Sequence, residues 1–435
     1  MNKAANNVSF ICKKYYFDQL ATELATPTYK HITSKTSENI LKEHQNEMLK
    51  LGHNIDDTHY KLPYIYWISK HHKNPTSERY IISGKFCSTK FISKKLSFIL
   101  KLVQKTLRYH YQYTCKFKNT SSFWITKNSL NVHESLRKIN FRNKAKSIST
   151  FDFSTLYTSI PHDKLIDFVT NAIDDSFTIS KKEYIKVTAY KATWTDTKKD
   201  NTGKTLWFDK QSINYWLKFL LDNIYLVMGD EVYQQIIGVP MGTDCAPDLA
   251  NLFLFWAECK YVMDGLNDGD DNVRKFQFVH RYIDDLLSLN DKGHFLKVFK
   301  DIYPNELQLK NTTIDSKTSN FLDLNISIEN NEFVTKLYDK RNDFSFKVIS
   351  MPNLHSNIPI KPAYGVFISQ VHRLFNINSK ADGFCNDVTL LADKLVKQNY
   401  QHSKLKYQLN KFILDKDSEI ITKYWKTIKV ADILV

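Results

Sequence analysis

Tyr282-Ile283-Asp284-Asp285 is the most informative segment of this 435-residue chain. It interrupts an apolar run from Phe276 to Leu289 in which β-favouring side chains stand on both sides of the two aspartates. Adjacent carboxylates inside such a run cost free energy unless water solvates them at a turn or a cation neutralises them. An Asp-Asp pair by itself is most often a solvated turn. The stretch therefore predicts a hairpin whose tip carries two carboxylates.

A second acidic element precedes this hairpin in the chain. Asp152 lies in a strand-like run from Ser149 to Pro161 that leads into a helical pattern beginning near His162. A strand that ends beside the hairpin would bring its carboxylate to those of Asp284 and Asp285. Mg²⁺ binds carboxylate and phosphate oxygens, and two such ions about 3.5–4 Å apart can promote an in-line displacement at phosphorus. We therefore predict that the three aspartates are catalytic metal ligands.

A glycine-containing loop from Gly238 to Pro247 lies between the two acidic elements, and the apolar stretch Leu249 to Trp256 follows it. Glycine lets the backbone come close to a flat partner, and the helix that follows offers its N-terminus. Taken alone, this segment is also explained as a tight loop that caps a core helix.

The order of these elements resembles motifs A, B and C of reverse transcriptases, most closely those of the Penelope-like retroelement group. The Phe-Asp-x-x-x-Leu-Tyr/Phe-Thr-x-Ile motif is matched from Phe151 to Ile160. The Met-Gly-Thr/Ser loop with its Ala-Asn/Asp-Leu-Phe helix is matched from Met241 to Phe253, and Arg-Tyr-Ile/Val-Asp-Asp from Arg281 to Asp285. The resemblance implies an α+β right-hand polymerase fold, with fingers, a palm built on an antiparallel sheet backed by helices, and a helical thumb.

The same resemblance implies an activity, cofactors and partners. The chain would be a nucleotidyltransferase, an RNA-directed DNA polymerase of a retroelement. It would extend the 3′-hydroxyl of a DNA primer on an RNA template with deoxynucleoside triphosphates. Two Mg²⁺ ions, or Mn²⁺ in their place, would serve as cofactors.

The resemblance also implies roles for single residues. The backbone carbonyl of Phe153 would complete the metal site. Tyr157 would exclude a ribose 2′-hydroxyl, although packing of a tyrosine at a strand end is the competing interpretation. Met241 and Gly242 would line the floor beneath the incoming base, with methionine where retroviral enzymes have glutamine. Lys310 is placed by position alone as a general acid for the leaving pyrophosphate, and an exposed loop lysine explains it equally well.

A basic segment upstream resembles the fingers motifs of the same group. It has a Lys-x-His-Lys-x-Pro loop from Lys70 to Pro75, followed by an Arg-x-Ile strand that begins at Arg79. Positive charge facing a triphosphate assists phosphoryl transfer, so Lys73 and Arg79 are the candidate phosphate contacts. A solvated turn is the alternative for the loop.

The motifs predict three regions. These are fingers over residues 1–120, palm over 121–330 with motif A at 151–161, motif B at 238–253 and motif C at 279–287, and thumb with C-terminal helices over 331–435. Periodicity and turn residues add local predictions. They are a strand at 8–12 with helix through Leu51, a helix at 208–223, a hairpin turning at Gly229-Asp230, a strand at 320–328, and thumb helices at 366–375 and 390–412.

Composition agrees with a nucleic-acid partner. The chain has 61 basic and 46 acidic residues, a formal net charge of +15, and its 42% hydrophobic residues suffice for a large core. Six cysteines without Cys-x-x-Cys spacing predict free thiols in a reducing compartment. No apolar run has the length of a membrane span and no signal peptide is evident, so we expect a soluble intracellular protein, either nuclear or cytoplasmic.

Two other functions fit the same residues. The first is another palm-type polymerase, such as one that copies RNA into RNA, and the 2′-hydroxyl exclusion expected of Tyr157 discriminates against it. The second is a catalytically inactive or truncated relative that binds nucleic acid. The Gly-Ile-Tyr and Tyr-Ile-Gly blocks of the group's endonuclease do not occur. We therefore expect a truncated copy or the core of a longer element.

Overall fold

The computed structural model describes residues 10–70, 77–142, 145–199, 201, 204–344, 346, 348 and 351–434. The α-helices are α1 Lys13–Leu24, α2 Ser37–Leu49, α3 Lys90–Lys116, α4 Ser129–Arg142, α5 Leu156–Ser159, α6 His162–Ser180, α7 Lys210–Asp222, α8 Ala246–Asn267, α9 His294–Ile302, α10 Ile360–Ile377, α11 Ala381–Val396 and α12 His402–Tyr424. The 3₁₀ helices are η1 Asp271–Phe276, η2 Lys340–Asp343 and η3 Val430–Asp432. The strands are β1 Tyr29–Ile32, β2 Ile65–Lys70, β3 Ser77–Ile82, β4 Ile148–Ser154, β5 Tyr184–Val187, β6 Ala192–Thr195, β7 Leu206–Phe208, β8 Tyr225–Met228, β9 Glu231–Gln235, β10 Val279–Tyr282, β11 Asp285–Leu289, β12 Gln308–Asn311, β13 Thr318–Phe321, β14 Leu324–Glu329 and β15 Glu332–Leu337.

A four-stranded antiparallel sheet, here called the central sheet, has the strand order β10-β11-β4-β12. The alternation of strand side chains explains how its two faces differ. Phe151 and Phe153 of β4 are buried in the main apolar core, whereas Asp152 between them points to the other face and is half-buried. A carboxylate therefore stands on the face opposite the core.

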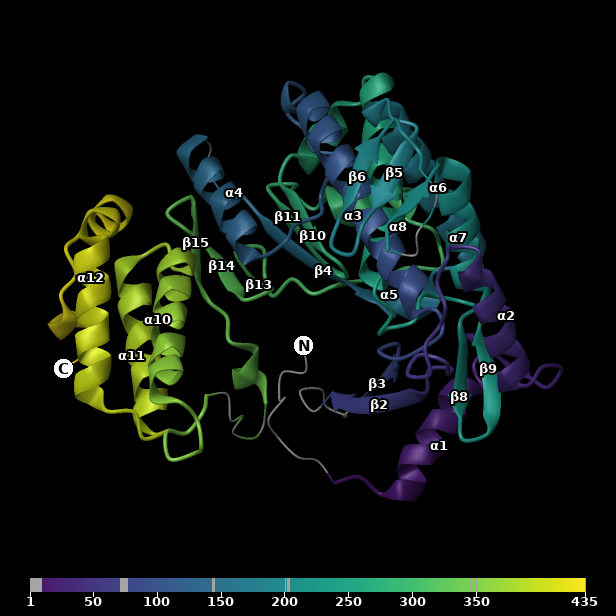
Figure 1. The fold of residues 1–435 in the computed structure, drawn as a ribbon. Helices are drawn as coiled ribbons and strands as arrows, with labels where there is room; N and C mark the ends of the chain where they lie inside the picture. Colours follow the sequence, from purple (N-terminus) through teal and green to yellow (C-terminus); the bar gives the residue numbers. More distant parts are fainter. Residues whose placement is uncertain are drawn as a thin grey trace.

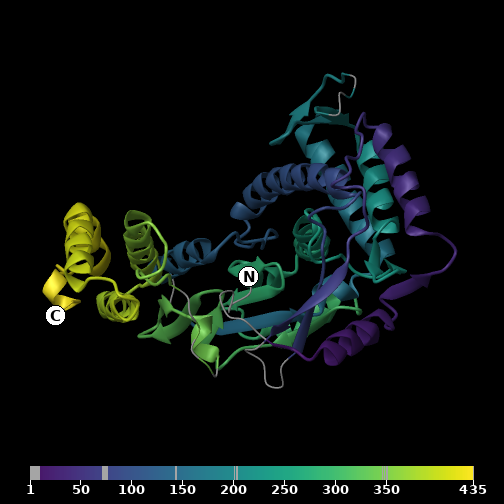
Figure 2. The ribbon, with the colours of Figure 1, turned by 60° about the horizontal axis from the view of Figure 1, so that its bottom comes forward.

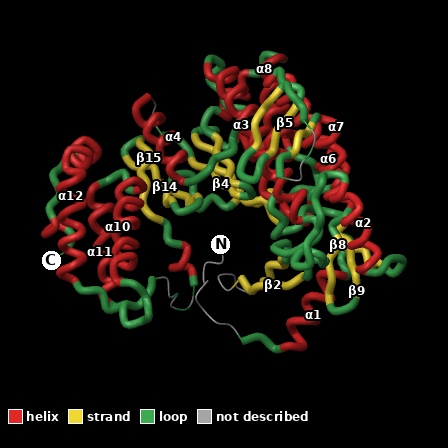
Figure 3. The backbone as a smooth tube through the Cα atoms, in the orientation of Figure 1, coloured by secondary structure: helices red, strands yellow, loops and turns green. Residues whose placement is uncertain are grey.

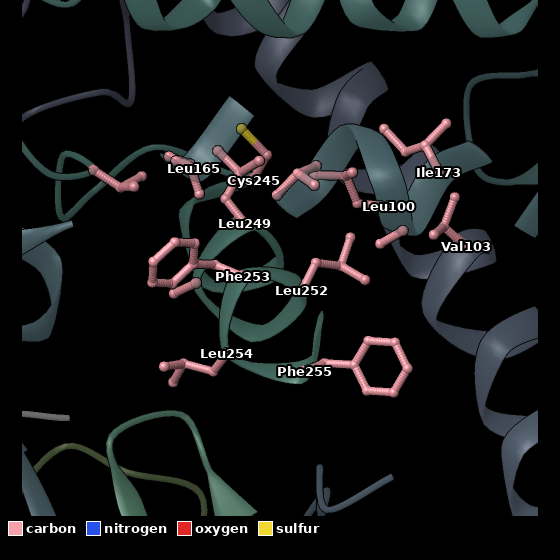
Figure 4. Close-up of a cluster of buried hydrophobic side chains, with 14 of the residues drawn as sticks. Leu100, Val103, Leu165, Ile173, Cys245, Leu249, Leu252, Phe253, Leu254 and Phe255 are labelled. Atoms are coloured by element: carbon pink, nitrogen blue, oxygen red, sulfur yellow. The ribbon is translucent and has the colours of Figure 1, made fainter. Parts of the chain in front are cut away.

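Helix α8 is the centre of that core. Its Leu252, Phe253, Leu254 and Phe255 are consecutive and all fully buried, which fits a helix that is apolar on every side. Figure 4 shows these side chains among leucine, isoleucine and valine side chains of α3 and α6. Helix α6 begins at His162 directly after Pro161, whose fixed φ of −65° suits the position before a helix. The proline thus separates β4 with its short α5 from the core helix.

Two smaller sheets contain the first three strands of the chain. Strands β2 and β3 form a hairpin, and β1, β9 and β8 form a three-stranded sheet. The predicted hairpin at Gly229-Asp230 is confirmed as β8 and β9, with Gly229 at φ +63°. The continuous helix predicted through Leu51 is wrong, because β1 separates α1 from α2. Of the strand predicted at 8–12, Phe10 to Cys12 form no strand, and residues 8 and 9 lie outside the described residues. Residues 29–32 form a strand because they pair with the distant strand β9, and the periodicity of the local sequence does not reveal such a pairing.

Two C-terminal predictions need correction. The strand predicted at 320–328 is a hairpin, because Leu322 takes φ +56° and β13 pairs back on β14. Leucine is not a usual turn residue, so composition hid this turn. The single helix predicted at 390–412 is two helices, because Asn399 adopts the left-handed conformation between them. The predicted helix at 208–223 is confirmed as α7.

The elements form an arch in both ribbon views (Figures 1 and 2). Helices α10, α11 and α12 lie at one end, and α1, α2, β2 and β3 lie at the other. The central sheet lies between the two ends, and Figure 3 shows that the C-terminal end is mostly helical. No helix in the described ranges has the length and apolar character that crossing a membrane requires. All six cysteines are free.

Candidate functional site

The Asp-Asp stretch forms the tip of a hairpin, as the sequence predicts. Tyr282 of β10 pairs with Asp285 of β11, so Ile283 and Asp284 are the two turn residues. Ile283 has a φ of +56°, which is unfavourable for a β-branched residue and is sustained only by the surrounding structure. The turn that carries the two carboxylates is therefore strained and held in place by its neighbours.

Asp152 lies next to this tip. It pairs directly with Asp285 in the antiparallel ladder of β4 and β11. The backbone N–H of Phe153 donates a hydrogen bond of 3.0 Å to the carbonyl oxygen of Asp284. Opposed residues of an antiparallel pair have Cα atoms about 4.5–5.5 Å apart and side chains on one face. The structure therefore brings Asp152, Asp284 and Asp285 together at one end of the central sheet.

Lys310 extends this row of charged residues. It is exposed on β12 and pairs directly with Asp152, so Asp285, Asp152 and Lys310 follow one another across three strands on one face of the sheet. An opposite charge directly across a strand stabilises a carboxylate. The sequence placed Lys310 in a loop or at a general-acid position, and the structure places it in a strand beside the aspartates.

The residues at the sheet end fit a hard divalent cation. Their donors are carboxylates at a strand and a neighbouring turn, and Mg²⁺ is usually held by one or two carboxylates with substrate phosphate oxygens. The described residues contain no group of three His, Cys, Asp or Glu side chains arranged to hold a metal by themselves. A metal that shares its oxygens with a bound phosphate does not require such a group.

Tyr157 lies between the carboxylates and the glycine loop. Burial raises the pKa of its phenol, and the negative charge of Asp284 raises it further. Its carbonyl oxygen accepts a 2.7 Å hydrogen bond from the N–H of Val239. A Cβ on Gly238 would lie 2.2 Å from the same oxygen, so this close approach requires glycine. The loop is thereby fixed against the segment that carries Tyr157.

The other end of the loop is fixed against β3. The N–H of Ile82 donates a 2.9 Å hydrogen bond to the carbonyl of Met241. Gly242 has a φ of +122°, and a Cβ there would lie 2.1 Å from the Ile82 carbonyl oxygen. Strand β3 also carries Arg79, which is half-buried and pairs with Ile68 of β2. The strand that carries the predicted phosphate contact Arg79 is therefore hydrogen-bonded directly to Met241, in the loop predicted to lie beneath the incoming base.

Lys73, the other predicted phosphate contact, lies outside the described residues. An ion pair that was not predicted from the sequence lies beneath the hairpin. Arg281 of β10 and Glu258 of α8 are both 0% exposed and are bonded to each other. Glu258 directly follows the apolar run Leu252–Ala257 of α8, and a glutamate there is the signal that could have revealed this pair.

No protein-family model matches the chain, and no curated protein matches it in sequence. Solved structures do resemble it. The telomerase of Candida albicans, in complex with the TWJ fragment of telomeric RNA, is 13% identical and superposes with a TM-score of 0.60 over 95% of this chain and 65% of the telomerase chain. This chain therefore spans about two thirds of that telomerase.

Two further structures are less alike. A Candida tropicalis telomerase with the same RNA fragment is 12% identical, with a TM-score of 0.48 over 94% of this chain and 58% of its own. The BmCPV RNA-dependent RNA polymerase at elongation state is 12% identical, with a TM-score of 0.43 over 80% of this chain and 28% of its own. At such low identities the likeness concerns the fold. This chain has a mixed helix and sheet fold similar to that of telomerase, which is a polymerase.

Proposed function

We propose that this chain is an RNA-directed DNA polymerase of the reverse-transcriptase type, encoded by a retroelement of the Penelope-like kind. The observation that carries the proposal is the direct pairing of Asp152 with Asp285, beside the turn residue Asp284. Three carboxylates gathered at one sheet end suit the binding of Mg²⁺ together with phosphate oxygens. The fold shared with a telomerase supports a polymerase rather than another phosphoryl transferase.

In this proposal the regions take the names used for right-hand polymerases. Residues 1–120 are the fingers, 121–330 the palm and 331–435 the thumb with its C-terminal helices. The central sheet is the palm sheet, and α10 to α12 form the thumb. The net charge of +15 supports contact with the phosphates of an RNA template and a DNA primer. The telomerase of similar fold is bound to RNA, which supports an RNA partner here.

The side chains at the sheet end then have distinct tasks. Asp152, Asp284, Asp285 and the Phe153 carbonyl would hold two Mg²⁺ ions or Mn²⁺. Such ions would supply activation of the primer hydroxyl and stabilisation of the leaving oxygen. Arg79 and Lys73 contact the triphosphate and offset its negative charge.

The remaining residues orient the nucleotide and protonate the leaving group. Met241 and Gly242 support the base, and their bond to Ile82 keeps that floor in register with the strand of Arg79. The ring of Tyr157 excludes a 2′-hydroxyl, which selects deoxynucleotides. Lys310 donates a proton to the departing pyrophosphate, a role that its place beside Asp152 supports.

A single-nucleotide extension assay on a DNA primer annealed to RNA tests the proposal. Wild-type protein is expected to extend the primer with Mg²⁺ and a complementary deoxynucleotide. Asp284→Asn is expected to abolish extension while primer-template affinity stays within about threefold, because the lost ligand acts on the transition state. Near-normal extension by Asp284→Asn would remove the metal assignment.

The alternatives give different results in the same assay. Preference for ribonucleotides would identify another palm-type polymerase, and Tyr157 near the carboxylates argues against that outcome. Primer-template binding without any extension would identify a nucleic-acid-binding relative.

A further inference from the structure

We propose that Arg281, together with Glu258, is a positioning element for the metal-binding aspartates, and that it couples their turn to α8. The inference rests on the proposed function and deepens it. Arg281 stands in β10, three residues before Asp284, yet its side chain points away from the metal face into the core. Its guanidinium lies beneath the strained turn rather than in contact with a substrate.

All five N–H groups of this guanidinium have partners. Nε donates to Glu258 Oε1 at 2.5 Å and Nη2 to Glu258 Oε2 at 3.1 Å. Nη2 also donates to the carbonyl of Asn251 at 3.2 Å, and Nη1 donates to Asn251 Oδ1 at 2.9 Å. The fifth bond, of 3.2 Å, runs from Nη1 to the carbonyl oxygen of Ile283. The planar fork of arginine is fully used, and lysine with three donors cannot reproduce it.

The two carbonyls of the turn are therefore fixed from different sides. The Ile283 carbonyl is held by Arg281, and the Asp284 carbonyl is held by the N–H of Phe153. The second bond ties the turn to the strand of Asp152. The bond from Arg281 to the Ile283 carbonyl ties the turn to α8, whose first residue Ala246 lies four positions after Gly242. Arg281 thereby fixes the position of the carboxylates relative to Met241 and Gly242, which would lie beneath the nucleotide.

The charges of the network explain why Glu258 is needed. An unpaired arginine beneath the aspartates would repel a divalent cation and would be costly to bury. Glu258 neutralises it, and the hydroxyl of Tyr303 donates a 2.8 Å hydrogen bond to Glu258 Oε1. Burial and the negative charge of Glu258 raise the pKa of Tyr303, so the phenol stays protonated as a donor. The network thus positions the turn without adding positive charge to the metal site.

Mn²⁺ binding measured by electron paramagnetic resonance of the free ion, without nucleic acid, tests this inference. Arg281→Lys and Glu258→Gln are expected to weaken Mn²⁺ binding about tenfold, as loss of a supporting contact does in other metal sites. In extension assays kcat should fall by a similar factor, while the deoxynucleotide KM and the primer-template Kd stay within about twofold. Arg274→Lys and Asp271→Asn, which alter a 3.1 Å ion pair on η1, are matched controls expected to change neither measurement.

A triple variant separates positioning from folding. Arg281→Met with Glu258→Leu and Tyr303→Phe replaces the buried pair and the hydroxyl bonded to it by apolar side chains, an exchange that commonly preserves stability. It removes the bond to the Ile283 carbonyl, so Mn²⁺ binding should still fall about tenfold at an unchanged unfolding temperature. If this folded variant bound Mn²⁺ with the affinity of the wild-type protein, the positioning role of Arg281 would be refuted, while the proposed metal site would stand. Absence of Mn²⁺ binding by the wild-type protein would overturn the proposed metal site as well.

Discussion

Lys310 lies directly opposite Asp152 in the antiparallel pair of β12 and β4, so both side chains leave the central sheet on the same face. If Lys310 protonates the leaving pyrophosphate, Lys310→Ala should lower kcat about 100-fold, the lower range for loss of a general acid. Lys310→Arg keeps the charge but cannot release a proton at neutral pH, so it should not restore kcat. Steady-state extension kinetics measure both variants.

Lys317 supplies the control for this experiment, because it is an exposed lysine of the loop between β12 and β13. Lys317→Ala should leave kcat unchanged. Full recovery by Lys310→Arg would show that the residue acts through its charge alone.

Tyr157 should decide which sugar is accepted. Its ring is half-buried beside the carboxylates, where it would meet a 2′-hydroxyl. Tyr157→Ala should lower the preference for deoxynucleotides over ribonucleotides by at least about tenfold, since shape exclusion by one side chain has this order of effect. Tyr157→Phe keeps the ring and should retain the preference. The ratio of kcat/KM for the two nucleotide types is the measurement, and an unaltered ratio in Tyr157→Ala would leave the tyrosine a packing role only.

Gly242 should be far less replaceable than Gly229. Both have positive φ, but a Cβ on Gly242 would lie 2.1 Å from the Ile82 carbonyl oxygen, whereas no described atom lies within 4 Å of one on Gly229. Gly229→Ala should cost only the backbone strain, about 1–2 kcal/mol. Gly242→Ala must also push the loop away from β3, so it should lower the unfolding temperature further and raise the deoxynucleotide KM. Equal unfolding temperatures for the two variants would contradict the packing of Gly242 against Ile82.

His133 should make stability depend on pH. Its Nδ1 lies 3.0 Å from Thr335 Oγ1, which links α4 to β15. Burial, together with the positive charges of Lys423 and Arg137, lowers its pKa from 6.5 to about 4. The unfolded chain therefore takes up a proton first as pH falls, so this stabilisation is complete above about pH 6.5 and is lost progressively toward pH 4.

The loss between pH 6.5 and about pH 5 should be on the order of 2 kcal/mol for this one group. His133→Gln removes the titration, so its unfolding temperature should fall less than that of the wild-type protein over this interval. His402→Gln changes an exposed histidine at the start of α12 and should leave the pH dependence as it is. The same pH dependence in His133→Gln and wild type would mean that His133 is not the group responsible.

Local patterns predicted much of this architecture. The Asp-Asp hairpin, the strand of Asp152, the long apolar helix after the glycine loop and the hairpin at Gly229 all have signals within a few residues of the chain. The turn at Leu322 and the strand β1 have no such local signal. Leucine is not a usual turn residue, and pairing with a distant strand does not produce a pattern in the local sequence.

Residue types along the chain show which side chains are suited to the proposed chemistry: carboxylates within apolar strands, glycines in one loop and an excess of positive charge. Their order along the chain determined the resemblance to polymerases. Which of these side chains lie next to one another depends on how the chain folds. Opposite residues of antiparallel strands are set by register, so the pairing of Asp152 with Asp285 and with Lys310 exists only once β4 lies between β11 and β12. The same holds for Arg281 and Glu258, because a buried charge finds its partner through packing of a helix on a sheet.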